Sequence, residues 1–103
     1  MTATVTHNVE KSRYDIETDG ELAGFAEYHE RDGIAAFLHT EISPDFGGRG
    51  LATQLIRESL DDARAKGWKI EPFCPFVRAF IQKNKDYRDL VNESQWARFD
   101  LTD

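Results

Sequence analysis

Three glycines stand within four positions in the run Gly47-Gly48-Arg49-Gly50. Glycine adopts backbone angles that are closed to other residues, and it leaves the amide N–H groups of a loop uncovered. A helix predicted from about Leu51 to Lys66 begins directly after this loop, so its unpaired N–H groups and positive dipole end point into it. Such an arrangement suits an anion, phosphate above all. A tight strand-to-helix turn without a ligand is the alternative interpretation.

His39 and Glu41 are two residues apart near the end of a predicted strand. The period-two geometry of a strand places both on one face together with Phe37, at the end nearest the glycine loop. An imidazole or a carboxylate in this place can take a proton from a substrate, so Glu41 and His39 are the candidate general bases. The alternative is a solvated strand-end carboxylate beside a hydrogen-bonded core histidine.

Cys74 is the only cysteine and lies in the run Pro72-Phe73-Cys74-Pro75. Each proline biases the preceding residue toward extended geometry and lacks an N–H donor, so strand pairing is expected to fail around Cys74. A thiol in such a place can give a proton or act as a nucleophile. A small buried hydrophobic residue is the alternative, because free cysteine is usually that. One cysteine excludes an internal disulfide.

The elements that must position these residues follow from apolar periodicity. Strands are predicted over Val5–Glu10, Arg13–Thr18, Leu22–His29, Ile34–Ile42 and Trp68–Phe73. Turn signals at Asp19-Gly20 and Arg31-Asp32-Gly33 make the first strands an antiparallel meander. The long helix then connects two neighbouring strands in a β-helix-β crossover. The prediction is an α+β (α/β) fold with a mixed, mainly antiparallel sheet.

Two further expectations concern coverage of the sheet and the end of the chain. The strand over Ile34–Ile42 is apolar on both faces near its middle, so we expect it to be covered on both sides. A short helix is predicted over Val77–Lys83. Residues 91–103 are expected to form a loosely attached tail, with Trp96 and Phe99 packed on the body.

Composition narrows the class of protein. The 103 residues are predicted to form a single domain, with a core over about residues 5–90 and the tail after it. A net charge of −6 argues against a nucleic-acid partner, which requires a basic face. The sequence has no apolar run of about 18 residues and no signal-like start, which predicts a cytoplasmic protein without a membrane partner. No histidine or cysteine cluster has zinc-ligand spacing, so no metal is expected.

The order of elements resembles the GNAT superfamily of acetyl-CoA-dependent N-acetyltransferases. The family's loop pattern fits at Gly50 and Ala52, whereas Gly47 stands where the family usually has Arg or Gln. Several blocks are similar to the minimal, single-domain YjdJ-type subgroup: His39-Thr40-Glu41-Ile42, Gly48-Arg49-Gly50-Leu51-Ala52, Pro72-Phe73-Cys74-Pro75-Phe76-Val77, Phe80-Ile81 and Tyr87-Arg88-Asp89-Leu90.

The resemblance implies an acyl-CoA N-acyltransferase fold in which two strands splay apart and admit the pantetheine arm. It implies acetyl-CoA as co-substrate, held by Ile42, Gly47, Gly48, Arg49, Gly50, Leu51 and Ala52. Many larger members protonate the departing thiolate with a tyrosine, but the matching place here falls near Phe80, which has no hydroxyl. Cys74 is then the alternative proton donor, or a nucleophile.

The function implied by the resemblance is transfer of an acetyl group from acetyl-CoA to an amine, on a small molecule or a protein, by a monomer or weak dimer. A non-catalytic acyl-CoA-binding or protein-interaction module is the alternative. A dinucleotide-binding oxidoreductase is disfavoured because Thr53 replaces the third glycine of its fingerprint. A P-loop nucleotidase is disfavoured because the sequence has no Gly-Lys-Ser/Thr.

Overall fold

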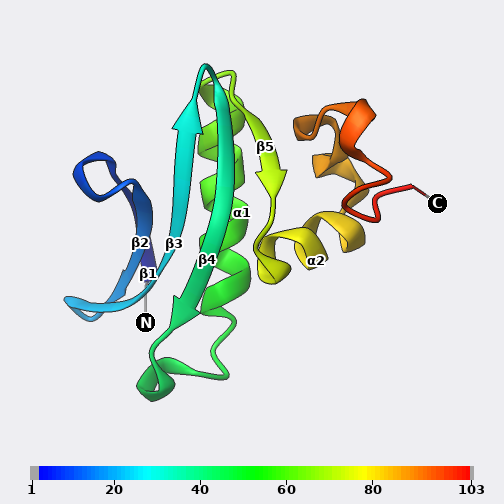
Figure 1. Ribbon diagram of the computed structural model, residues 1–103. Helices are drawn as coiled ribbons and strands as arrows, with labels where there is room; N and C mark the ends of the chain where they lie inside the picture. Colours follow the sequence, from blue (N-terminus) through cyan, green and yellow to red (C-terminus); the bar gives the residue numbers. More distant parts are fainter. Residues whose placement is uncertain (1–2, 103) are drawn as a thin grey trace.

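The computed structural model describes residues 3–102, in which one five-stranded sheet has its strands in sequence order and the long helix α1 packs against one face (Figure 1). The strands are β1 (Ala3–Asn8), β2 (Arg13–Thr18), β3 (Glu21–Arg31), β4 (Ile34–Ile42) and β5 (Lys69–Pro72). The helices are α1 (Leu51–Ala65) and α2 (Pro75–Lys83), with short 3₁₀ turns at Val9–Lys11, Pro44–Phe46, Lys85–Leu90 and Glu93–Gln95.

Tight hairpins join β2 to β3 and β3 to β4. Asp19 and Gly20 both have positive φ, at 54° and 78°, and Asp32 and Gly33 repeat this pattern at 53° and 83°. Positive φ at both central residues is the geometry of a type I′ turn, which matches the twist of the flanking strands. The predicted antiparallel meander is therefore confirmed for β1 to β4.

The crossover after β4 is also confirmed. Helix α1 follows the glycine loop, and Gly67 ends it with a φ of 78° in the left-handed region that suits glycine after a helix. Strand β5 then runs parallel to β4, beginning at the pair Ile34 and Lys69. The sheet is thus mixed and mainly antiparallel, as predicted.

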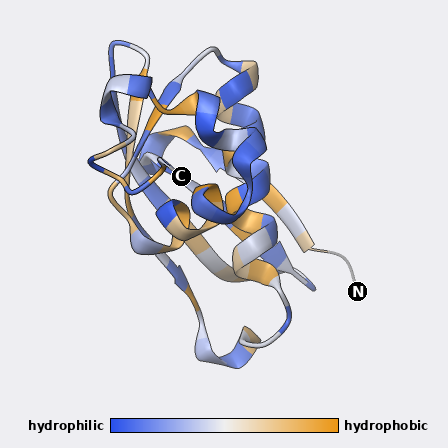
Figure 2. Ribbon diagram, turned by 90° about the vertical axis from the view of Figure 1, so that its right-hand side faces the viewer, coloured by the Kyte–Doolittle hydropathy of each residue, from blue (hydrophilic) through white to orange (hydrophobic). Residues whose placement is uncertain are grey.

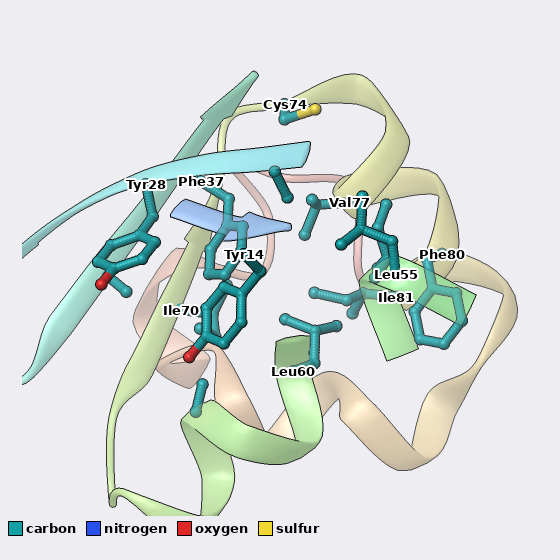
Figure 3. Packing of buried hydrophobic residues seen from close by; sticks show 14 of the residues in the cluster. Tyr14, Tyr28, Phe37, Leu55, Leu60, Ile70, Cys74, Val77, Phe80 and Ile81 are labelled. Atoms are coloured by element: carbon teal, nitrogen blue, oxygen red, sulfur yellow. The ribbon is translucent and has the colours of Figure 1, made fainter. Parts of the chain in front are cut away.

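The core lies between the sheet and the helices (Figure 3). Tyr14, Tyr28 and Phe37 place their rings side by side, with centroids 5.7 to 6.2 Å apart. Leu55 of α1 and Val77 of α2 are both fully buried in the neighbouring part of the same cluster. The apolar stripe of α1 therefore fixes the glycine loop relative to the sheet.

A β-bulge in β4 changes which residues share a face. Phe37 pairs with Tyr28 and His39 pairs with Glu27, so Leu38 is an extra residue without a partner on β3. The bulge shifts the side-chain alternation by one position. Phe37 and Thr40 are consequently buried on the helix side, whereas His39 and Glu41 are exposed. The prediction that His39 and Glu41 share the face of Phe37 is wrong.

The expectation that β4 is covered on both faces is also wrong. Leu38 is 53% exposed, and the helices pack on the side of the sheet where Phe37 is buried. On this second face of β4, Ile34 and Ala36 are only partly shielded from solvent.

The C-terminal segment is packed more tightly than expected. Val91, Phe99 and Leu101 are at most 2% exposed, so the segment is not loosely attached. Phe99 meets the ring of Phe73 edge to face, at 5.3 Å between centroids. Figure 2 views the molecule from this side, with the C-terminal end lying in front of the body. Phe99 and Trp96 do pack on the body, as predicted.

Candidate active site

The glycine loop presents an uncapped helix start. Gly48 and Gly50 have φ values of 78° and 73°, and Gly50 is the N-cap of α1 without any side-chain cap. The N–H of Gln54 donates to the carbonyl of Gly50, while the N–H groups of the preceding first-turn residues have no partner within the helix. No acidic side chain stands in this turn. The loop therefore keeps the positive field that an anion requires.

Strands β4 and β5 separate beyond Phe37. Their pairing runs only from Ile34 to Phe37, and the last bond between them is donated by the N–H of Cys74 to the carbonyl of Phe37 at 2.8 Å. The N–H of Phe73 turns back to the carbonyl of Glu71. The remaining part of β4, residues 38–42, has β3 on one side and no paired strand on the other within residues 3–102. The predicted loss of pairing therefore occurs at Phe73 and after Cys74, whereas the Cys74 N–H itself still bonds to β4.

His39 and Glu41 lie together, as expected, although on the opposite face from Phe37. His39 Nε2 is 2.9 Å from Glu41 Oε1, and the two side chains are 54% and 57% exposed. Across β3, Phe25 pairs with Glu41 and Glu27 pairs with His39. The pair is thus solvent-accessible beside the unpaired edge of β4, where a carboxylate can receive a proton.

Thr40 is a site residue that sequence reasoning missed. Its side chain enters the interior because the bulge at Leu38 reverses the alternation, and Thr40 is 5% exposed. Cys74 Sγ donates to Thr40 Oγ1 at 3.4 Å, and Cys74 is 2% exposed at the start of α2 (Figure 3). Strict period two places Thr40 with Leu38, so no signal in the sequence pairs it with Cys74.

Gly24 is a second position that the sequence did not single out. It lies on β3 opposite Ile42, and a Cβ there would stand 2.3 Å from the Glu41 carbonyl oxygen. Real Cβ atoms do not approach so closely, so β4 can run past β3 at Glu41 only because residue 24 is glycine.

A groove of about 340 Å³ separates the first turns of α1 from α2. Ala52, Thr53 and Phe80 line it, together with Lys83. The Arg57 guanidinium stands 5.7 Å from the centroid of Phe80, so two cationic side chains flank the groove. An elongated ligand that starts at the glycine loop can continue along it.

The aromatic residues near this groove offer no hydroxyl to the strand gap. Phe80 is buried and packs edge to face against Tyr87 at 5.1 Å. The Tyr87 hydroxyl donates to Asp61 on the solvent side of α1. Burial and this bond both raise the pKa of Tyr87. Of the predicted catalytic residues, Cys74 is therefore the one that is buried where β4 and β5 separate.

A second hollow, of about 420 Å³, lies between β1 and α1. Asp62 is the shared partner of several polar groups here: the Tyr14 hydroxyl and the Lys66 ammonium both donate to it, and His7 Nδ1 is 3.5 Å from the same carboxylate. Burial and the bond to Asp62 raise the pKa of Tyr14 far above its usual range. These mutually paired groups indicate a structural cluster.

Residues 3–102 contain no group of three His, Cys, Asp or Glu side chains that could hold a metal ion. Over the same residues, no helix is both long enough and apolar enough to cross a membrane.

Known proteins share the sequence pattern and the fold of this chain. A sequence profile described as GCN5-related N-acetyl-transferase matches residues 13–90. A GCN5-like N-acetyltransferase candidate from Staphylococcus aureus has a TM-score of 0.65 at 21% identity, covering 86% of this chain and 87% of its own. A ribosomal-protein-alanine N-acetyltransferase from Brucella melitensis biovar Abortus 2308 has a TM-score of 0.51 at 22% identity, covering 78% of this chain and 60% of its own. No curated protein matches.

At these identities the solved structures establish a shared fold, and the acyltransferase fold predicted from the order of elements is confirmed. The profile match spans most of the chain, from the start of β2 to the end of the 3₁₀ turn at Leu90. The predicted superfamily is therefore confirmed, while the YjdJ-type subgroup stays a prediction. The chain belongs to the GCN5-related N-acetyltransferase family and is an acetyltransferase.

Proposed function

We propose that the protein transfers an acetyl group from acetyl-CoA to an amine at the separation of β4 and β5. One observation carries this proposal: the unpaired edge of β4 beyond Phe37 lies next in the chain to the uncapped start of α1. An extended amide-bearing arm can pair with a free strand edge, while a pyrophosphate occupies a helix start. Few ligands combine an extended amide-bearing arm with a pyrophosphate, and acetyl-CoA is one of them.

The co-substrate is expected to follow the chain from the strand edge to the helices. Its pantetheine arm pairs with the edge that ends at Ile42, and its pyrophosphate accepts N–H bonds from residues 48–52. The residues expected to surround the pyrophosphate are those of the loop and helix start: Gly47, Gly48, Arg49, Gly50, Leu51 and Ala52. The groove between α1 and α2 then receives the nucleotide end, where Arg57 and Lys83 supply positive charge.

Glu41 is proposed to remove a proton from the acceptor. An amine near neutral pH is mostly charged, and it must lose a proton before its lone pair can attack a thioester. Glu41 is exposed and hydrogen-bonded to His39, so it can act directly or through a water. His39 is the alternative base, because it is similarly exposed and is hydrogen-bonded to Glu41.

Cys74 is proposed to give a proton to the departing CoA thiolate. Attack of the amine forms the new C–N bond, the C–S bond breaks, and the sulfur keeps the bonding pair. The Cys74 S–H gives its proton to the CoA sulfur, and the second proton released by the acylated nitrogen returns to the Cys74 thiolate. The first proton, taken from the charged amine by Glu41, passes to solvent. Cys74 donates the last bond between β4 and β5 through its N–H, and its thiol donates to Thr40 Oγ1.

The test is release of CoA from acetyl-CoA in the presence of a panel of amines, with binding of CoA measured separately by calorimetry. Turnover with at least one amine, together with CoA binding, is the expected result. Binding of CoA without turnover of any amine would instead favour a non-catalytic acyl-CoA-binding module. Failure to bind CoA would remove the proposed co-substrate.

A further inference from the structure

The sheet face opposite α1 is open around the proposed base. In Figure 1, β3 and β4 lie in front of α1, and no helix stands before them. Two rows of side chains cross this face: Asp15, Phe25 and Glu41 form one, and Arg13, Glu27 and His39 form the next. We call these six residues, with Glu17 and Leu22 of the adjoining pair, the open face.

The open face is strongly acidic at one place. Asp15, Glu17, Glu27 and Glu41 stand against a single fixed cation, Arg13. Arg13 is an example of a cationic group bound on this surface. Its guanidinium lies 4.6 Å from the Phe25 centroid and bonds to Asp15 at 2.7 Å. The carboxylates of Glu17 and Glu27 lie on exposed residues beyond this contact. The chemistry of the open face is thus complementary to further cationic side chains beside an aromatic ring.

We propose that the open face docks a basic segment of another protein and presents a lysine side chain of that segment to Glu41. This inference rests on the proposed function and names its acceptor. The segment crosses β2 to β4, with cationic residues near Glu17 and Glu27 and its acceptor lysine at the His39–Glu41 pair.

Exposure favours a polypeptide over a small amine. His39 and Glu41 are more than half exposed, and Leu38 beside them is 53% exposed. One ion pair at so solvated a place contributes little, so a compact amine gains little affinity there. A peptide spreads several such contacts and apolar contacts to Phe25 and Leu22 over the surface, and their sum produces specific binding.

The test uses blocked peptides of equal length that carry one lysine as the only amine. In one peptide the lysine is flanked by arginines, in another by glutamates, and N-acetyl-lysine methylamide serves as the compact acceptor. The variant pair Glu17→Gln with Glu27→Gln removes two of the four carboxylates of the open face without changing the proposed base. Glu10→Gln with Glu93→Gln, exposed carboxylates on the two 3₁₀ turns at Val9–Lys11 and Glu93–Gln95, is the matched control.

The arginine peptide is expected to have a KM about tenfold or more below that of the other acceptors, with the difference shrinking at high salt. Glu17→Gln with Glu27→Gln should raise this KM about three- to tenfold and leave kcat and the methylamide kinetics unchanged. Equal KM values for the arginine and glutamate peptides, or an equal loss in the control pair, would overturn the proposal.

Binding of the fluorescently labelled arginine peptide, measured by anisotropy without acetyl-CoA, separates this inference from the proposed function. Tight binding that Glu17→Gln with Glu27→Gln weakens supports the docking surface even if no turnover occurs. Turnover of the methylamide without any preference for the arginine peptide leaves the acetyltransferase intact and rejects the docking surface.

Discussion

Cys74 Sγ lies 3.4 Å from Thr40 Oγ1, and both side chains are enclosed where β4 and β5 separate. The contact joins residues that are 34 positions apart in the chain. Two local irregularities create it. The bulge at Leu38 turns Thr40 inward, and the shift of pairing from Phe73 to Cys74 brings the thiol to the same strand edge. The thiol thus has a fixed donor direction before any substrate arrives.

Cys74→Ala is expected to lower kcat about 10²-fold while CoA still binds, because the departing thiolate loses its proton donor. Thr40→Val should change the pH dependence of kcat, since it removes the acceptor that orients the thiol, and Thr40→Ser should restore it. Kinetics at several pH values provide the measurement.

Three roles for Cys74 give different results in that experiment. Intact mass after incubation with acetyl-CoA alone should show no acetyl adduct for a proton donor, whereas a nucleophile would carry one acetyl group on Cys74. A purely structural cysteine would lower the free energy of unfolding in Cys74→Ala and leave turnover per folded molecule unchanged. That last outcome would reject both chemical roles.

Glu41→Gln is expected to reduce kcat/KM about 10²-fold or more near neutral pH, because the amide cannot take the acceptor's proton. The loss should shrink as the pH rises, because more of the amine is then already uncharged. His39→Ala should have a smaller effect if it only orients Glu41 through the 2.9 Å contact. Wild-type turnover in both variants over about pH 6–9 would exclude the pair as general base.

Much of the fold could be predicted from the sequence because its signals are local. Asp19-Gly20 specified a hairpin that needs only positive φ at both positions, and Gly67 specified the end of α1. The left-handed backbone of the loop at Gly48 and Gly50 followed from glycine for the same reason. Such features depend on the backbone preferences of individual residues, which are present in any context.

The face assignments failed because they depend on pairing between strands. Leu38 gives no local sign that it is the bulged residue; the shift arises from how β3 and β4 align along their whole length. One extra residue moved Thr40 into the core and His39 to the open side. The tight attachment of residues 91–102 was likewise missed, because it depends on tertiary contacts such as that of Phe99 with Phe73, which no periodicity in the segment indicates.

Stability is expected to fall on acidification from about pH 7 to 5 because of His7. Burial and nearby Lys66 lower the pKa of His7 below 6.5, although Asp62 opposes the shift. Below pH 6.5 the unfolded chain therefore binds a proton that the native chain still refuses, and the native state loses free energy relative to it. His7→Gln should flatten this slope in urea unfolding, whereas His29→Gln, at an exposed histidine, should preserve it.

Asp62 is expected to govern a second, more acidic loss of stability. Burial raises its pKa, but hydrogen bonds from Lys66 and Tyr14 outweigh burial and hold the pKa below 3.8. The stabilisation is present above the unfolded value and is lost as the pH falls through the native pKa. Urea unfolding of Asp62→Asn should show lower stability near neutrality and a shallower decline below about pH 4. An unchanged acid limb would show that other carboxylates dominate it.

Gly50→Val is expected to abolish CoA binding, with Gly20→Val as its matched control. Both glycines have φ in the left-handed region, 73° and 78°, and a Cβ at either would meet no atom within 4 Å. Both substitutions therefore carry the same kind of backbone strain, about 1–2 kcal/mol or more for a β-branched residue. Only Gly50 caps the helix whose N–H groups are proposed to hold the pyrophosphate. Calorimetry should show at least a tenfold weaker affinity for CoA in Gly50→Val and an unchanged affinity in Gly20→Val, with circular dichroism confirming that both fold. Equal affinities in the two folded variants would place the pyrophosphate away from the loop and leave the strand edge alone to account for binding.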